Sequence, residues 1–340
     1  MVPALGATAV RTIGKSATSW WFRYSRSRVQ AKGATFMAIL LQSGWAPAEP
    51  PPAVRLVLGV DARYLVPACV TLSSVVSCGD RRALSVDVLH FDLTGAHIAM
   101  LESVGAWLGL RIRVQQVSDH FVPANSTLPH ISRATYLRLA AHDTIPPCDR
   151  MIYVDSDLLV RGDIVALASL PLRKPVGAVP DAYLTAGDAS LKQLGLWLAP
   201  DGRRYFNAGV YLTDFRWHRR LDLDQRARGF LGPYAGRIRY GDQDAINVAW
   251  GEFIEPLHTS WNHPVSLLWP ESASAQGRAA KLATRLGAAQ ILHFEGAFKP
   301  WHARVPSTEV VREYRQELNR VLRRLDQTGW TLYRRRGCYC

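Results

Sequence analysis

Short apolar runs alternate with amphipathic stretches from about residue 54 onwards, and this alternation predicts strands and helices in turn. Strands are expected at residues 54–60, 84–91, 111–117 and 151–154, and helices at residues 67–77, 94–108 and 134–141. Thr94 has a side chain suited to cap the second of these helices, and Pro146-Pro147 interrupts the chain after the third. Strand–helix alternation of this kind predicts an α/β fold with a mainly parallel sheet and helices on both faces.

Acidic residues stand where two of the expected strands end. Asp61 follows the first strand, and Asp155 and Asp157 follow the fourth. In open parallel sheets, ligands bind beyond the carboxyl ends of the strands. Two carboxylates at i and i+2 on a turn can face one Mg²⁺ or Mn²⁺ ion that also holds a diphosphate. A solvated turn would give the same D-x-D pattern. So would a haloacid-dehalogenase-like phosphatase, although Leu158 and Leu159 depart from that class.

The composition is that of an ordinary globular protein, with 340 residues, 48% hydrophobic and 20% charged, which excludes wholesale disorder and collagen-like repeats. The net charge of +13 is concentrated at the two ends. Residues 1–48 carry six Lys/Arg and no acid, and residues 312–340 carry eight Arg against three acids. Subtracting these ends from +13 leaves +2 for residues 49–311. A nearly neutral middle argues against a nucleic-acid groove, and no nucleic-acid partner is expected.

Residues 1–52 are expected to form a basic, disordered extension that ends in a Pro-rich linker, because the prolines at 50–52 cannot join a helix or a central strand. The Arg/Ser-rich start is typical of a transit peptide, or of an upstream extension before a start near Met37. The five cysteines form no regular framework, which indicates a reducing compartment and predicts a cytoplasmic location. No run of 18 apolar residues is present.

Residues 303–340 predict a basic amphipathic helix and tail, with Ser307 or Thr308 as the cap. The apolar positions that share one face are Val310, Val311, Tyr314, Leu318, Val321, Leu322 and Leu325. Five arginines lie on the other face, at 312, 315, 320, 323 and 324. Such a helix suits peripheral contact with an anionic membrane, and it equally suits a helix packed on the preceding domain with its basic face in water.

Six segments in a fixed order carry a family resemblance. They are Val60-Asp-Ala-Arg-Tyr64, His130–Arg138, Asp155-Ser156-Asp157, Tyr205–Leu212, Tyr240–Asn247 and Leu292–Trp301. Through them, residues 54–302 resemble glycosyltransferase family 8, most of all its bacterial lipopolysaccharide and lipooligosaccharide galactosyl- and glucosyltransferases, with glycogenin more distant. The resemblance implies a GT-A catalytic domain at residues 53–302. It also implies retaining, metal-dependent transfer of galactose or glucose from a UDP-sugar to a saccharide acceptor, with lipid-linked lipopolysaccharide core expected.

The same resemblance implies roles for the matched residues. The metal ligands are Asp155, Asp157 and His293, which would hold Mn²⁺ or Mg²⁺. The residues that contact the donor or its nucleotide are Asp61, Tyr64, Arg138, Ser156, Asp181, Asn207, Gly296 and Lys299. His130 and the stretch 181–201 are expected to shape the acceptor pocket, and Trp261-Asn262 is interpreted as structural. Ala62 and Ala297 depart from the family pattern at positions that need no reactive group.

Asp242 and Gln243 match the catalytic pair beneath the reacting face of the sugar. Retention by double displacement needs a carboxylate nucleophile, and an amide is a poor one. We therefore favour same-face substitution, with Gln243 stabilising positive charge near the anomeric carbon. Asp242 stays a candidate nucleophile. The alternatives to this function are a self-glucosylating or other polysaccharide-initiating transferase and a non-catalytic UDP-sugar-binding protein. Peripheral contact with the cytoplasmic face of the inner membrane would agree with a lipid-linked acceptor.

Overall fold

The computed structural model describes residues 54–79, 83–124, 132–182, 184, 204–235, 237–265, 286–303, 305–330, 334–335 and 338–339. The expected extension at residues 1–52 and the acceptor candidate His130 lie outside the described residues. The boundaries of the catalytic domain and of the C-terminal tail therefore stay predictions.

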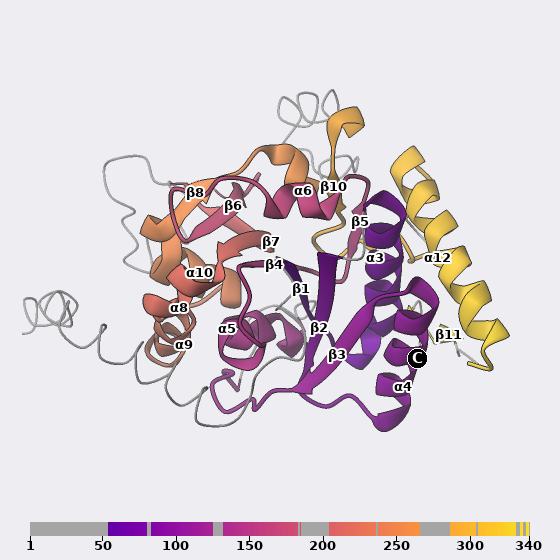
Figure 1. Cartoon of the computed structure of the whole chain (residues 1–340), viewed down its shortest axis with the longest axis horizontal. Coiled ribbons are helices and arrows are strands. Elements are labelled where there is room, and N and C mark those ends of the chain that lie inside the picture. Colours follow the sequence, from indigo (N-terminus) through magenta and orange to yellow (C-terminus); the bar gives the residue numbers. More distant parts are fainter. Residues whose placement is uncertain are drawn as a thin grey trace, which may run out of the picture. The chain divides into compact units, whose positions relative to one another are not determined.

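A seven-stranded sheet forms the centre of the fold, in the order β3-β2-β1-β4-β7-β6-β8 (Figure 1). Its strands are β1 (Val54–Gly59), β2 (Leu84–His90), β3 (Arg111–Gln116), β4 (Arg150–Val154), β6 (Val176–Pro180), β7 (Phe206–Asp214) and β8 (Ile254–Pro256). Parallel pairs join β1 to β2 and β4, β2 to β3, and β6 to β8. Only β7 runs antiparallel to its neighbours, β4 and β6. The mainly parallel sheet predicted from the sequence is confirmed.

Helices pack against both faces of this sheet, because side chains of successive strand residues point to opposite faces. Leu56 and Leu58 of β1 belong to one hydrophobic core, whereas Val57 belongs to the other. The first core includes α3 (Leu65–Cys78), α4 (Gly95–Leu108) and α12 (Glu309–Gln327). The second includes η3 (Arg133–Ala140), α5 (Ala141–Thr144), α8 (Phe215–Arg220), α9 (Leu223–Tyr234) and α10 (Asp242–Trp250). The helices on either side can be followed in Figure 1.

A small second sheet lies beside the first, in the order β5-β10-β9. It is formed by β5 (Leu158–Val160), β10 (Ile291–His293) and β9 (His263–Pro264). The remaining short elements are η1 (Ala62–Tyr64), α6 (Ile164–Ala168), η4 (Gly251–Phe253), η5 (Thr259–Asn262), η8 (Leu286–Ala288), β11 (Arg334–Arg335) and β12 (Cys338–Tyr339). β10 pairs antiparallel with β5, which follows β4 closely in the chain. This pairing brings a late segment of the chain next to the end of β4.

Local structure agrees with the predicted elements, with one difference of type. Thr94 caps α4 as predicted, and its Oγ1 accepts a hydrogen bond from the backbone N–H of His97. Residues 134–141 were expected to be helical, and the structure forms a 3₁₀ helix through Ala140 followed by one α-turn. Eight residues is long for a 3₁₀ helix. Inside it, the Arg138 Nε donates to the carbonyl of Thr135, so the side chain helps to hold the tighter turn.

The C-terminal helix α12 packs its apolar face on the protein. Its buried residues are Val310, Val311, Tyr314, Leu318, Val321 and Leu325, all within the core that contains α3. The exposed positions include Arg312, Arg320 and Arg323. Of the two interpretations of the amphipathic pattern, the structure thus shows the packed helix with a solvated basic face. In the described part of the chain, no helix combines the length and apolar character needed to cross a membrane.

Candidate active site

The two acidic residues after β4 and a histidine from the other end of the chain meet at one edge of the sheet. Asp155 follows the last residue of β4, and its backbone N–H donates to the carbonyl of Gly209, 2.8 Å away. Asp157 immediately precedes β5, in which Leu158 pairs with His293 of β10. Strand pairing therefore brings an imidazole to two carboxylates that precede it by more than 130 residues.

The three side chains converge on a common point. The Nε2 atom of His293 lies 3.4 Å from Oδ1 of Asp157 and 3.7 Å from Oδ2 of Asp155. One ligand atom from each residue lies within 4.8 Å of the others. The Nδ1 atom of His293 is 2.9 Å from Oδ1 of Asn262, an acceptor, so Nδ1 donates its N–H to Asn262 and Nε2 is the nitrogen that faces the two carboxylates. Two carboxylate oxygens and an imidazole nitrogen are ligands that fit a divalent cation such as Mn²⁺ or Mg²⁺.

The second oxygen of each carboxylate is held by a permanent cation. Oδ1 of Asp155 is 2.6 Å from the Arg138 guanidinium, and Oδ2 of Asp157 accepts from the Lys299 ammonium. Burial raises the pKa of Asp157, but the charges of Lys299 and His293 outweigh it and lower this pKa overall. At Asp155 burial outweighs the attraction of Arg138, and the pKa is raised. Each carboxylate thus keeps one oxygen for the shared point.

Arg138 is almost fully buried and links two acidic residues. Its Nε lies 2.8 Å from Oδ2 of Asp242, and its guanidinium lies over the Tyr153 ring, 4.6 Å from the centroid. Asp242 begins α10, is 3% exposed and accepts a hydrogen bond from Thr135 Oγ1 at 2.5 Å. Burial raises the pKa of Asp242 to about 6, although Arg138 and Thr135 act against the shift. The carboxylate of Asp242 is therefore committed to Arg138 and Thr135.

Gln243, the next residue of α10, has both ends of its amide engaged. Its Oε1 accepts from the backbone N–H of Ala208 at 3.0 Å, and its Nε2 donates to Oδ2 of Asp181 at 3.2 Å. The same Asp181 oxygen accepts from Nδ2 of Asn207, also at 3.2 Å. Asp181, Asn207 and Gln243 are thus in direct contact, and the family resemblance implies that they contact the donor sugar and its reacting face.

Asn262 connects this group to the candidate metal ligand. Its Nδ2 donates to Oδ1 of Asn207 at 2.8 Å, while its Oδ1 faces His293. A continuous chain of hydrogen bonds therefore runs from His293 through Asn262, Asn207 and Asp181 to Gln243. The sequence analysis interpreted Asn262 as structural and did not predict its contacts with His293 and Asn207. The signal that locates it is the parallel pairing of β9, which follows Asn262, with β10.

Asp61 caps the helical turn that follows β1. Its Oδ1 accepts from the backbone N–H groups of Arg63 and Tyr64 at 2.9 and 3.0 Å, and its Oδ2 accepts from Ser132 Oγ. The Tyr64 ring stands edge-on to Trp301, with centroids 5.8 Å apart, and the Lys299 ammonium lies 5.9 Å from the Tyr64 centroid. These contacts bring Tyr64 beside Lys299. The expected contact of Asp61 with the nucleotide base stays a prediction.

Ser156 and Gly296 have roles in the local backbone. The hydroxyl of Ser156 is turned toward the sheet, where it donates to the carbonyl of Gly59 at 3.4 Å. Gly296 has a φ of +80°, a left-handed conformation that favours glycine. The donor contacts expected of both residues stay predictions.

Gly209 of β7 provides space for the converging side chains. A Cβ added at this position would overlap the His293 ring and lie 2.9 Å from Oδ2 of Asp155. Only a residue without a side chain fits there while His293 and Asp155 keep their positions.

Comparisons with known proteins found a matching family model, similar proteins and similar solved structures. A family model described as Glycosyl transferase family 8 matches residues 55–304. General stress protein A of Bacillus subtilis (strain 168) is 30% identical over 249 residues, which are 71% of this chain and 84% of the relative. A lipopolysaccharide 1,2-glucosyltransferase of Escherichia coli (strain K12) is 25% identical over 251 residues, 73% of each chain. The crystal structure of galactosyltransferase LgtC with donor and acceptor sugar analogs has a TM-score of 0.65 at 24% identity, covering 78% of this chain and 95% of LgtC.

Proposed function

The chain belongs to glycosyltransferase family 8 and is a glycosyltransferase with a GT-A fold, and we propose that it transfers galactose or glucose from a UDP-sugar to a saccharide acceptor with retention of anomeric configuration. The observation that carries the proposal is the convergence of Asp155, Asp157 and His293 beside Lys299 and Arg138. In this arrangement the three ligands would bind a metal ion that holds the donor diphosphate. The nearby positive charge would stabilise the diphosphate as it leaves the sugar.

Asp155, Asp157 and His293 would hold Mn²⁺ or Mg²⁺. When bound, such an ion neutralises charge on the diphosphate as it departs. Asn262 keeps the proton of His293 on Nδ1, so that Nε2 stays available. Lys299 and Arg138 keep the second oxygens of the two carboxylates occupied, which fixes the direction in which the free oxygens point.

Lys299 is the group that would stabilise the leaving UDP. Burial lowers the pKa of its ammonium, but Asp157 outweighs burial and raises this pKa overall, so the side chain stays charged. Its Nζ also donates to the carbonyl of Phe294 at 2.8 Å, which fixes its position before a donor arrives. A fixed, buried positive charge costs little reorganisation when negative charge develops on the leaving group.

The surroundings of Asp242 and Gln243 favour substitution on one face of the sugar over a covalent intermediate. Asp242 is buried and bound by Arg138 and Thr135, so its oxygens are poorly placed to attack an anomeric carbon. The Gln243 amide, held by Ala208 and Asp181, offers a dipole but no good nucleophile. In our proposal Gln243 stabilises positive charge on the sugar, while an oxygen of the departing diphosphate accepts the proton of the acceptor hydroxyl.

Lipopolysaccharide core is the acceptor that we propose, supported by the name of the Escherichia coli relative. Such an acceptor is lipid-linked, so the enzyme would work beside an anionic membrane. The apolar face of α12 packs inside the protein, and membrane contact by this helix would therefore rest on exposed arginines such as Arg312 and Arg323.

The donor can be identified without knowledge of the acceptor. The purified chain is incubated with Mn²⁺ and, in separate reactions, UDP-glucose, UDP-galactose and UDP-N-acetylglucosamine, and released UDP is measured. We expect slow hydrolysis of either UDP-glucose or UDP-galactose. An increase in the mass of the protein by hexose units would favour the self-glucosylating alternative, and tight UDP binding without any turnover would favour the non-catalytic one.

A further inference from the structure

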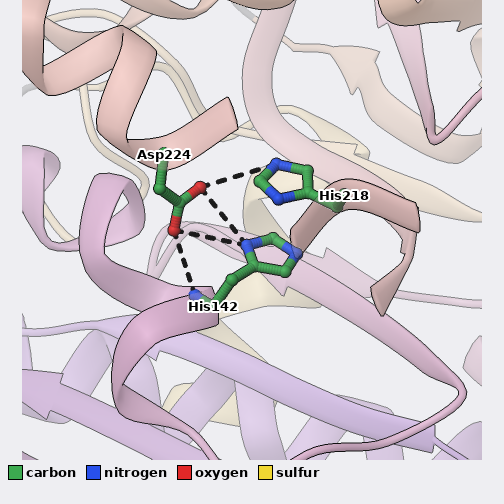
Figure 2. A group of neighbouring side chains, drawn as sticks. All are labelled: His142, His218 and Asp224. Carbon is green, nitrogen blue, oxygen red and sulfur yellow. Dashed lines mark hydrogen bonds and ion pairs between the residues drawn. The ribbon is translucent and has the colours of Figure 1, made fainter. Parts of the chain in front are cut away.

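Two histidines and an aspartate form a second cluster, beneath β7 and separate from the residues described above. His142 lies in α5, His218 in α8 and Asp224 in the first turn of α9, and Figure 2 shows the three side chains facing one another. Their exposed fractions are 1%, 0% and 3%. None of the three residues has a role in the proposed transferase activity.

The spacing of the donor atoms is that of ligands around a small cation. Oδ1 of Asp224 lies 3.3 Å from Nδ1 of His142 and 3.5 Å from Nε2 of His218. A tetrahedral ion with bonds of about 2.0–2.1 Å places its ligand atoms about 3.3–3.4 Å apart. One ligand atom from each of the three residues lies within 4.8 Å of the others.

Several of these atoms are buried without a hydrogen-bond partner. Among the residues that the structure describes, none provides a hydrogen-bond partner for the two ring nitrogens of His218 or for Oδ1 of Asp224. Among the described residues, no arginine or lysine forms an ion pair with Asp224, whereas the neighbouring Asp143 takes both Arg219 and Arg228. A buried carboxylate is normally paired or bound to a metal, and each unsatisfied buried group is costly. Oδ2 of Asp224 is satisfied by His142, so the cluster has three polar atoms that the described residues leave unsatisfied.

The protonation of the histidines suits metal binding. Burial, with a smaller contribution from the Arg219 charge, lowers the pKa of His142 to about 3, and burial also holds the pKa of His218 well below its usual value. Both rings are therefore neutral near pH 7. In the structure Nδ1 of His142 lies 3.3 Å from Oδ2 of Asp224, and Nε2 lies 3.0 Å from Thr213 Oγ1. In the metal-bound form Thr213 Oγ1 would accept the N–H of Nε2, which leaves the lone pair of Nδ1 to the ion, as in many metal-binding histidines.

We propose that His142, His218 and Asp224 bind a divalent transition metal, and that Zn²⁺ is the ion that fits them best. Two imidazole nitrogens and one carboxylate oxygen are ligands that Zn²⁺ favours, and a water molecule takes the fourth position. The site is structural: it joins α5, α8 and α9 in the core next to β7 and α10. Its burial leaves no access for a saccharide.

Binding replaces the contact between Nδ1 of His142 and Oδ2 of Asp224, and it also requires one ring to move. The two rings stack in parallel, with centroids 3.5 Å apart and planes 7° apart, so one ion cannot lie in both ring planes. The ring of His218 must tilt toward Asp224. No hydrogen bond of its ring nitrogens opposes this movement, and its edge-on contact with Trp250 is the packing that must adjust.

The test uses a full-length parent protein that carries His293→Gln, Cys338→Ser and Cys340→Ser, so that the candidate active site lacks its imidazole and the C-terminal Cys-Tyr-Cys segment lacks its thiols. The metal-free parent is titrated with Co²⁺ and with Zn²⁺ alone, and bound metal is counted after gel filtration. We expect one tight equivalent, a tetrahedral Co²⁺ absorption spectrum, displacement of Co²⁺ by Zn²⁺, and a higher melting temperature with Zn²⁺. Asp224→Asn, which retains an oxygen for the backbone N–H of His142, should weaken Zn²⁺ binding by about 100-fold or more. The matched control, Asp222→Asn, changes an exposed residue of the same turn and should not.

Either of two results overturns the proposal. The first is a folded parent that binds neither Co²⁺ nor Zn²⁺ and melts at the same temperature with and without them. The second is an Asp224→Asn protein that retains the bound ion. If Asp224→Asn does not fold, NMR of the Co²⁺-loaded parent decides. Imidazole N–H signals shifted by the ion, and lost in His218→Phe, support the site, and their absence excludes it.

Discussion

Asn262 and His293, 31 residues apart, are joined by a hydrogen bond of 2.9 Å between Oδ1 and Nδ1. The bond fixes the imidazole so that Nε2 faces Asp155 and Asp157, and through its other amide atom Asn262 reaches Asn207. One amide side chain thus couples the candidate metal ligand to the residues assigned to the donor sugar.

This coupling predicts that two substitutions of Asn262 differ in their effect on Mn²⁺ affinity. Asn262→Ala removes the acceptor for the His293 N–H and should weaken Mn²⁺ binding by about 10–100-fold. Asn262→Asp keeps an oxygen for His293 but loses the donor to Asn207, so it should retain most of the Mn²⁺ affinity. Paramagnetic resonance titration of Mn²⁺ in the presence of UDP measures both, with exposed Asn319→Ala on α12 as the control. Equal Mn²⁺ affinity in Asn262→Ala and wild type would refute the orienting role.

Gly209 predicts a steric effect on the same site. The Cβ of Gly209→Ala would overlap the His293 ring and approach Asp155, so Mn²⁺ affinity should fall at least tenfold, with a destabilisation of about 1–3 kcal/mol. Gly229→Ala in α9, where the added Cβ meets no described residue within 4 Å, should leave Mn²⁺ binding unchanged and stabilise the helix by about 0.5–1 kcal/mol. Urea unfolding and Mn²⁺ titration of the two variants test this contrast, which fails if both bind Mn²⁺ like wild type.

Asp242 predicts a dependence of stability on pH. Burial raises its pKa in the folded protein from 3.8 to about 6, so the folded state binds this proton more tightly than the unfolded state does. The resulting stabilisation is present below about pH 4 and is lost as the pH rises toward 6, a change of about 3 kcal/mol. Asp242→Asn lacks the titrating group. Urea unfolding between pH 4 and 7 should therefore show that the variant loses less stability than wild type as the pH rises. Parallel curves would contradict the raised pKa.

The commitment of Asp242 to Arg138 predicts that no covalent sugar–enzyme intermediate forms on it. Mass spectrometry of wild-type protein quenched during turnover should find no hexose on the peptide that contains Asp242. Asp242→Asn should keep measurable activity, because the amide retains the hydrogen bond from Thr135, whereas loss of a true nucleophile would abolish turnover. A hexose trapped on Asp242 would establish double displacement instead.

The apolar pattern was sufficient to predict four of the seven strands of the central sheet, β1 to β4, two long helices and the edge of the sheet where Asp155 and Asp157 lie, but it did not predict β6, β7 or β8. Pattern alone could not tell what the apolar face of α12 contacts, because lipid and a protein core select the same side chains. It also could not place Asn262 at the site, since that contact depends on the pairing of β9 with β10. His142, His218 and Asp224 show no ligand spacing in the sequence. Three short elements that pack together bring them into contact.

The most direct test of the proposed function measures Mn²⁺-dependent release of UDP from the hexose donor by wild type, Asp157→Asn and Asp326→Asn. Asp157 supplies one of the three converging donor atoms, whereas Asp326 is exposed near the end of α12. We predict turnover by wild type and Asp326→Asn that stops when Mn²⁺ is chelated, and a loss of at least about 100-fold in Asp157→Asn. Equal UDP release by all three proteins, or release that is unchanged by chelation, would contradict the metal-dependent transferase site.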